Sequence, residues 1–140
     1  VYAEILERLG RKSAWAVHGT TGAGAPVDEV STMGPTRICR SGVGRERVDE
    51  VVDPRDLGIP EAKVEELQGG DAGENARILT RILDGSETGP KLDLVLLNAG
   101  AGLACAGLAG DLQAGVEKAR ELIESGSALT RLRLLQDAAR

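Results

Sequence analysis

Aromatic side chains are almost absent from this chain, and this limits both its core and its partners. Among its 140 residues, Tyr2 and Trp15 are alone, and phenylalanine does not occur. The core must therefore be built from Leu, Val, Ile and Ala, as in helix-rich α/β proteins. Stacking of bases on aromatic rings, a common way of holding single-stranded nucleic acid, is not available to it. The length predicts one domain that needs neither disulfides nor a structural metal to fold.

Glycine is unusually frequent. Nineteen of the 140 residues are glycine, about twice the usual share of roughly 7%. Glycine adopts left-handed backbone and lets chain segments approach each other closely. We therefore expect many tight turns and several close backbone contacts.

The charge balance also narrows the range of partners. With 17 basic and 22 acidic residues the chain carries a net charge of −5, which repels phosphate backbones and anionic membrane surfaces. We therefore expect no nucleic acid and no membrane as partner.

The cysteines indicate neither a disulfide framework nor a zinc site. Cys39 and Cys105 are far apart in the sequence, and His18 is the single histidine. This pattern fits a reducing cytoplasm. The weakly charged stretch 94–110 is too short and small-sided to predict a membrane span, and no basic segment that would predict a signal peptide opens the chain.

The sequence pattern of the first half of the chain predicts a helix followed by strands. Apolar spacing predicts a helix over 1–9, and a short apolar run predicts a buried strand over 13–19. Residues 19–26 are rich in glycine and are expected to form a loop without regular structure. Alternation of polar and apolar residues predicts an antiparallel hairpin made of 36–40 and 46–52.

The second half reads as helical. A short helical turn is predicted over 53–58, with Asp as N-cap and Pro at the first helical position. Asp71 can cap a helix that runs to Leu83. The stretch 91–108 combines strand-like and helix-like features, and we favour one buried helix. Two amphipathic helices are predicted over 111–124 and 128–139.

Two adjacent carboxylates at the end of the glycine-rich segment, Asp28 and Glu29, form the most informative candidate site. Mg²⁺ binds one or two carboxylates directly and fills its other positions with water and substrate phosphates. On a regular strand the two side chains would face opposite ways, so joint binding requires irregular backbone or one water-mediated contact. From spacing alone, an ordinary solvated acidic turn is the favoured explanation of the pair.

Other polar residues have structural interpretations. The glycines at 19–24 could present N–H groups to an anion, but they lack a Walker lysine and the dinucleotide-binding spacing. His18 could act as an acid or base, although no Ser or Cys is arranged to make a triad with it. Asn98 stands in an apolar run and is expected to be a structural tether. Cys105 is expected to be a small core residue, and the glycines at 69–70 a turn before the Asp71 cap.

A series of short motifs, taken together, resembles the anthranilate phosphoribosyltransferase family. Their order and approximate spacing hold over essentially the whole chain, which corresponds to the carboxyl-terminal part of the family's sequence. The motifs are Trp-Ala-Val-His-Gly at 15–19, Asp-Glu-Val-Ser at 28–31, Gly-Pro-Thr at 34–36, Asp-Pro-Arg-Asp-Leu-Gly at 53–58, Gly-Gly-Asp at 69–71, Glu-Asn-Ala at 74–76, Leu-Leu-Asn-Ala at 96–99 and Ser-Gly-Ser-Ala at 125–128.

The resemblance implies a fold and a reaction. The fold is α/β, part of the larger α/β domain of a nucleoside phosphorylase or phosphoribosyltransferase-like protein, with a mixed sheet and packed helices. The reaction joins anthranilate to phosphoribosyl pyrophosphate and releases pyrophosphate, the second step of tryptophan biosynthesis from chorismate. By motif match, the family's Mg²⁺-binding pair falls on Asp28 and Glu29. No residue of this chain is assigned a catalytic role by it.

The resemblance also implies what residues 1–140 lack. The family's Gly-Thr-Gly-Gly-Asp loop, its Lys-His-Gly-Asn-Arg segment, its anthranilate-binding arginine and the helical domain that usually forms the homodimer contact all correspond to positions upstream of Val1. The loop before Asp28 is also a few residues longer than the family pattern. We therefore expect residues 1–140 to be one partial α/β domain that is inactive alone.

Two other functions fit the same residues. One is a non-catalytic phosphoribosyltransferase-like module that binds a nucleic acid or a protein, which the negative charge and the retained Asp28–Glu29 pair disfavour. The other is a fragment of a pyrimidine nucleoside phosphorylase, which shares the fold but fits the motif series less well.

Overall fold

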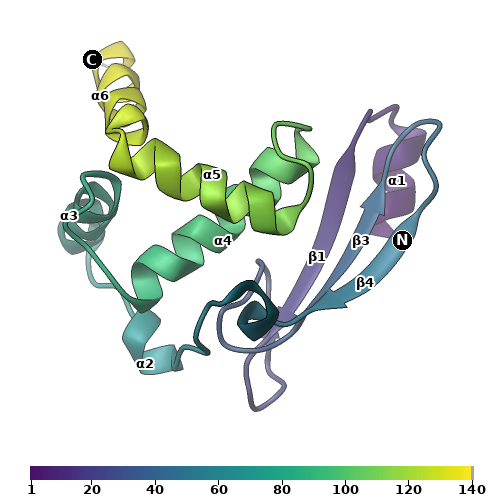
Figure 1. Ribbon diagram of the computed structural model, residues 1–140, viewed down its shortest axis with the longest axis horizontal. Coiled ribbons are helices and arrows are strands. Elements are labelled where there is room, and N and C mark those ends of the chain that lie inside the picture. The colour runs from purple at the N-terminus through teal and green to yellow at the C-terminus, as the bar shows by residue number, and fades with distance from the viewer. Residues whose placement is uncertain (140) are drawn as a thin grey trace.

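The computed structural model describes residues 1–139 and places the strands before most of the helices (Figure 1). The sheet lies at one side of the molecule, and the longer helices lie at the other. In chain order the elements are α1 (Tyr2–Arg8), β1 (Ala14–Thr20), β2 (Pro26–Val27), β3 (Thr36–Ser41), β4 (Val48–Val52), the 3₁₀ helix η1 (Pro54–Leu57), α2 (Val64–Leu67), α3 (Ala72–Leu83), α4 (Pro90–Cys105), α5 (Leu112–Glu124) and α6 (Ser127–Ala138).

The four strands form one sheet in the order β2-β1-β3-β4, and each neighbouring pair is antiparallel. The α/β class is confirmed, but the described sheet is not mixed as we expected. Parallel neighbours need a long crossover connection. Here the strands follow one another along the chain with short links, and the long helices come only after β4, so the strands pair antiparallel.

The register of β1 and β3 assigns each side chain to one face of the sheet, because side chains alternate along a strand. Val17 pairs with Ile38 on the face that packs on the core. His18 pairs with Arg37 on the other face. Helix α1 covers part of this second face, where the Ser41 hydroxyl donates to the Ala3 carbonyl at 3.0 Å.

The prediction of a buried strand at 13–19 is only partly right. β1 forms there, yet His18 is exposed and Trp15 and Val17 are half-buried. Among residues 1–139, α1 is the helix that covers the second face of the sheet, and it covers only part of it, so β1 is not enclosed on both sides by the described elements. The glycine-rich segment 19–26 is also more ordered than expected, since its first two residues end β1 and Pro26 begins β2.

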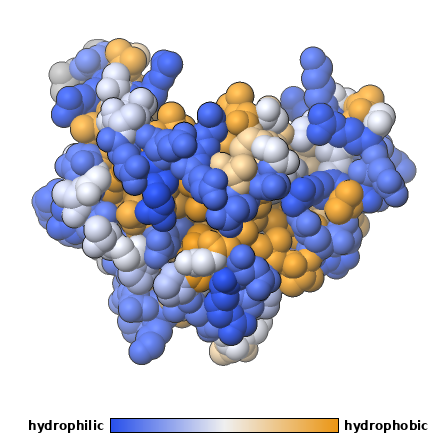
Figure 2. All heavy atoms as spheres, in the orientation of Figure 1, coloured by the Kyte–Doolittle hydropathy of each residue, from blue (hydrophilic) through white to orange (hydrophobic). Residues whose placement is uncertain are grey.

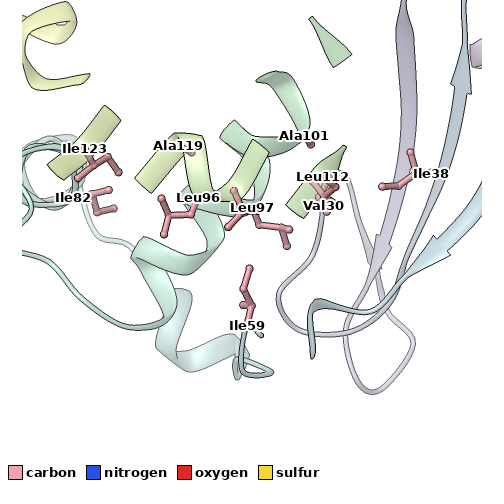
Figure 3. Packing of buried hydrophobic residues seen from close by; sticks show 11 residues of the cluster. Val30, Ile38, Ile59, Ile82, Leu96, Leu97, Ala101, Leu112, Ala119 and Ile123 are labelled. Carbon is pink, nitrogen blue, oxygen red and sulfur yellow. The ribbon is translucent and has the colours of Figure 1, made fainter. Parts of the chain in front are cut away.

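The hydrophobic core joins the sheet to the helical layer. In Figure 3, Ile38 projects from the sheet toward Val30 and Leu112, while Ile82 and Ile123 lie at the opposite end of the cluster. Figure 2 shows apolar side chains gathered in the middle of this face, with hydrophilic residues around them. The buried members are Val30, Ile38, Ile59, Ile82, Leu96, Leu97, Ala101, Leu112, Val116, Ala119 and Ile123.

The helices confirm most of the local expectations. The stretch 91–108 contains one helix rather than a strand, as favoured, although α4 ends at Cys105. Asp53 caps η1 by accepting from the Arg55 N–H at 3.0 Å, and Asp71 caps α3 by accepting from the Glu74 N–H at 2.8 Å. The short helix α2 within the charged segment 61–67 was not expected. No helix described within residues 1–139 is both long and apolar enough to cross a bilayer.

Candidate functional site

The Asp28–Glu29 pair lies on a bend directly after β2, where the chain leaves the sheet and turns toward the core. Val27, just before the pair, is paired with Gly19 of β1. Val30, just after it, is buried in the hydrophobic core. The backbone of the pair is therefore irregular, as joint binding of a cation requires, and it is anchored on both sides.

Gly19 allows this bend to lie directly against β1. A Cβ atom on Gly19 would overlap the carbonyl oxygen of Glu29 and would lie 2.9 Å from Cβ of Ser31. No side chain fits in that space, since real Cβ atoms are not found so close to other heavy atoms. The glycine at position 19 thus serves close approach of two backbone segments rather than a turn.

Ser31 and Thr36 fix the chain that follows the carboxylates. The Ser31 N–H donates to Thr36 Oγ1 at 2.9 Å, and the Ser31 hydroxyl donates to the Thr20 carbonyl at 2.8 Å. Both side chains are fully buried. Hydrogen bonds of buried polar groups are costly to break, so the segment after Glu29 has a defined path.

The two carboxylates are exposed, and within residues 1–139 neither makes a hydrogen bond or ion pair with a cationic side chain. Partial burial raises the pKa of Glu29 above its ordinary value, and the negative charge of Asp28 raises it further. Two neighbouring carboxylates without a positive partner repel each other, and a bound cation offsets that repulsion.

The donor set suits a hard cation that brings its other ligands with it. Two carboxylates match the requirement of Mg²⁺, which keeps several waters and binds substrate phosphates. No cluster of three or more His, Cys, Asp or Glu side chains able to hold a metal occurs in the described part of the chain. A closed structural metal site is therefore not formed by these residues, whereas an open magnesium site is compatible with them.

His18 is not part of this arrangement. Its neighbour Gly19 faces the Asp28–Glu29 bend, and successive residues of a strand point to opposite faces. His18 therefore points to the face of the sheet away from the carboxylates. The structure does not bring the two candidate groups together.

The glycine-rich loop forms the tip of the β1–β2 hairpin rather than an anion cradle. The N–H groups of Thr21, Gly24 and Ala25 are all used in hydrogen bonds within the loop. The Glu61 carboxylate lies over it, with Oε1 2.8 Å from where a Cβ of Gly22 would be. The use of these three donors within the loop and the nearby negative charge both disfavour phosphate binding there.

Asn98 and the turn at 69–70 have structural roles, as expected, whereas Cys105 is not the core residue that was predicted. Asn98 is a tether: it binds both backbone polar groups of Val30. Asn75 holds the turn before α3 by donating to the Gly70 carbonyl at 3.0 Å and accepting from its N–H at 2.9 Å. Cys105 is half-buried, with its sulfur 3.8 Å from the Ser13 hydroxyl.

Sequence reasoning missed the residues that hold the candidate site in place. Ser31 and Thr36 were not singled out, although a Ser directly after an acidic pair and a Thr after Gly-Pro are short side chains suited to backbone hydrogen bonds. Gly19 was placed at the end of a predicted strand and the start of a predicted loop, but its close approach to another segment was not foreseen, although a glycine inside a strand pattern is a signal of it.

Comparison with known proteins identifies the class to which this fold belongs. The model of the glycosyl transferase family, a/b domain, matches residues 1–129. The match includes nearly the whole chain, and the chain therefore belongs to this family.

Its curated relatives are more specific in name. The chain is similar to the anthranilate phosphoribosyltransferase of Thermoanaerobacter sp. (strain X514), with 46% identity over 130 residues. It is 44% identical over 135 residues to that of Desulfatibacillum aliphaticivorans. These alignments cover 93% and 96% of this chain but 37% and 38% of the relatives, so the chain spans little more than a third of their length.

Solved structures show the same relationship in three dimensions. The crystal structure of anthranilate phosphoribosyltransferase from Thermus thermophilus matches with a TM-score of 0.79 and 40% identity, over 94% of this chain and 36% of that one. The Saccharomyces cerevisiae enzyme in complex with PRPP and Mg matches with a TM-score of 0.72 and 27% identity, over 85% of this chain and 33% of that one.

Proposed function

We propose that this chain is the carboxyl-terminal part of the α/β domain of an anthranilate phosphoribosyltransferase, with Asp28 and Glu29 as its magnesium carboxylates. The observation that supports this is the exposed carboxylate pair, held on an anchored irregular bend and without a cationic partner. The similar yeast enzyme is described with PRPP and Mg, which fits a donor set that needs substrate phosphates to complete it.

The role of these residues follows from the charges in the reaction. When C1 of the ribose leaves its diphosphate, negative charge develops on the leaving group, and bound Mg²⁺ would neutralise it. Asp28 and Glu29 would hold the cation, and the anchored bend would keep them in place before substrate arrives. Preorganisation of this kind avoids reorganisation during the reaction.

The same charges indicate that residues 1–140 do not make a complete active site. The chain has a net charge of −5, and two of its negative groups, at the candidate site, face a highly anionic substrate. Groups that bind the phosphates and the anthranilate carboxylate must come from other segments. We propose that these groups lie in a part of the polypeptide that corresponds to the two thirds of the relatives' sequences not covered by this chain. Residues 1–140 alone are then inactive.

The partners and the setting follow from this assignment. The substrates are phosphoribosyl pyrophosphate and anthranilate, and the complete enzyme is a cytoplasmic homodimer. Nucleic acid and membranes are not partners, because the net charge repels both.

The first test is the intact mass of the native polypeptide from its source, which we expect to be well above that of 140 residues. The second is loss of anthranilate fluorescence with phosphoribosyl pyrophosphate and MgCl₂. We expect turnover from the longer polypeptide and none from residues 1–140. Turnover by residues 1–140 alone would overturn the claim that the site is incomplete, and release of nucleobase from pyrimidine nucleosides with phosphate would overturn the choice of reaction.

The magnesium assignment is tested separately in the longer polypeptide. Asp28→Asn and Glu29→Gln should each raise the Mg²⁺ concentration needed for half-maximal activity. Glu65→Gln is the matched control, since Glu65 is an exposed carboxylate of α2. If Asp28→Asn and Glu29→Gln respond to Mg²⁺ as the control does, the assignment is wrong.

A further inference from the structure

The side chain of Asn98, on α4, forms hydrogen bonds to the backbone of Val30, which lies 68 residues earlier in the chain. Its Oδ1 accepts from the Val30 N–H at 2.9 Å, and its Nδ2 donates to the Val30 carbonyl at 2.9 Å. A third bond, from Nδ2 to the Leu94 carbonyl at 3.0 Å, ties the amide to its own helix. The side chain is therefore fixed in orientation, because reversing the amide would lose all three bonds.

These hydrogen bonds fix the carboxyl-terminal end of the Asp28–Glu29 bend, and the β1–β2 pairing fixes its amino-terminal end. Val30 directly follows the Asp28–Glu29 pair, and Val27 directly precedes it. Between these two fixed points, the Glu29 carbonyl packs against Gly19. The backbone of the pair is held by three contacts, while its two carboxylates have no cationic partner among residues 1–139.

The backbone of the pair is held in place, while its two carboxylates repel each other and have no cationic partner among the described residues. This arrangement is suited to binding a cation. Ligand groups bind more tightly when their positions are set in advance by hydrogen bonds beneath them. If the turn bound no cation, burial of the Val30 side chain in the core would be enough to anchor it. The Asn98 amide is instead half-buried, and burying a polar group has a cost that its hydrogen bonds must offset.

We propose that Asn98 is a positioning residue for the Asp28–Glu29 pair, and that it sets the affinity of the site for a divalent cation. The proposal rests on the proposed magnesium role of that pair. Asn98 does not touch the cation. It acts through Val30 on the two residues before it.

The test compares Asn98→Ala and Asn98→Asp with Ile82→Ala in the longer polypeptide. Asn98→Ala removes all three bonds. Asn98→Asp keeps the shape but replaces both Nδ2 donors by a carboxylate oxygen facing two carbonyls. Ile82→Ala is the matched control, because Ile82 is buried at the far end of the core, so the substitution lowers stability without touching Val30.

Two quantities are measured beside the unfolding temperature: the Mg²⁺ concentration for half-maximal turnover, and binding of Mn²⁺ in the presence of phosphoribosyl pyrophosphate by electron paramagnetic resonance. Loss of a hydrogen-bond partner of a metal ligand typically weakens metal binding by about 10–100-fold. Asn98 bonds to the residue after the pair rather than to a ligand, so its effect belongs at the lower end of that range. We expect both Asn98 variants to weaken cation binding about tenfold and Ile82→Ala to leave it within about twofold.

The outcomes separate this inference from the proposed function. If Asp28→Asn and Glu29→Gln weaken cation binding but the Asn98 variants behave like Ile82→Ala, Asn98 is a purely structural residue and only the inference fails. If Asp28→Asn and Glu29→Gln also leave cation binding unchanged, the magnesium assignment fails and the inference with it. If Asn98→Ala does not fold, Asn98→Asp decides.

Discussion

Gly115 of α5 meets Gly100 of α4 backbone to backbone: a Cβ atom on Gly115 would overlap the Gly100 carbonyl oxygen and would lie 2.8 Å from its carbonyl carbon. In the other direction, a Cβ on Gly100 would lie 2.6 Å from the backbone nitrogen of Val116. Backbone atoms inside packed helices cannot move aside cheaply. The two glycines therefore set the separation of α4 and α5, and α4 carries the residue that holds the candidate site.

Gly115→Ala should consequently destabilise the fold. Overpacking of a filled interior typically costs about 1–3 kcal/mol, and we expect a loss of that size in the free energy of unfolding by urea. Gly102→Ala is the matched control. It lies on the facing helix α4 with no atom within 4 Å of its Cβ position, and it should stabilise the helix by up to about 1 kcal/mol. Equal effects of the two substitutions would refute the close approach.

Gly19→Ala should disturb the candidate site more than the global fold. The added methyl group collides with the Glu29 carbonyl and with Ser31, so the Asp28–Glu29 bend must move away from β1. We expect Mn²⁺ binding in the longer polypeptide to weaken by about tenfold. Gly22→Ala in the same hairpin is the control, because its close neighbour is the end of the flexible Glu61 side chain. Unchanged Mn²⁺ binding in Gly19→Ala would count against this account.

Asp53 should make stability depend on pH at the acid end. The Arg55 guanidinium and N–H lower the pKa of Asp53 from 3.8 to about 2. Because the folded protein favours the ionised carboxylate, this stabilisation is complete above about pH 4 and is lost as the pH falls toward 2. Asp53→Asn keeps an N-cap acceptor but removes the charge.

The measurement is the urea midpoint of wild type and Asp53→Asn between about pH 2 and pH 6. The gap between the two proteins should be largest at the upper end of this range and should close toward the acid end. A gap that stays constant with pH would show that the Asp53 charge does not contribute.

Ile38 should be critical for attaching the sheet to the helices. It is fully buried, whereas the other side chains that the described strands contribute to the core, Trp15, Val17 and Val52, are partly buried. Ile38→Ala should cost about 2–5 kcal/mol of unfolding free energy in urea. Val51→Ala in the neighbouring strand β4 is the control, because Val51 is 69% exposed on the other face. A similar loss from both substitutions would mean that the sheet is not anchored through Ile38.

Local signals predicted the elements well because they depend on neighbours in sequence. The caps at Asp53 and Asp71 and the hairpin of β3 and β4 need only a few residues to form. The Asp28–Glu29 pair was also recognisable, through its residue types and the family motif. Its irregular backbone was anticipated as a condition for metal binding, and the structure meets that condition.

Contacts between distant segments were not predictable from one sequence. Asn98 was expected to be a tether, yet nothing in its neighbourhood indicates that its partner is Val30. The β3–β4 hairpin was predicted, but the antiparallel pairing of β1 with β3 was not, because the expectation of a mixed sheet came from the family resemblance rather than from the order of strands and helices. The exposure of His18 depends on α1 being the only described helix on its face of the sheet, which is a property of tertiary packing.

The strand order leaves two borders of the sheet, β2 and β4, that differ in character. β2 has two residues and starts with Pro26, which has no N–H to offer. β4 has five residues, and among the described strands it has β3 as its neighbour on one side only. At the β2 border, proline thus limits the backbone hydrogen bonds that a further strand could form. At the β4 border, backbone groups remain available for such pairing. Lateral growth of the sheet, by a strand from a longer polypeptide or by a neighbouring molecule in a concentrated sample, would take place beside β4.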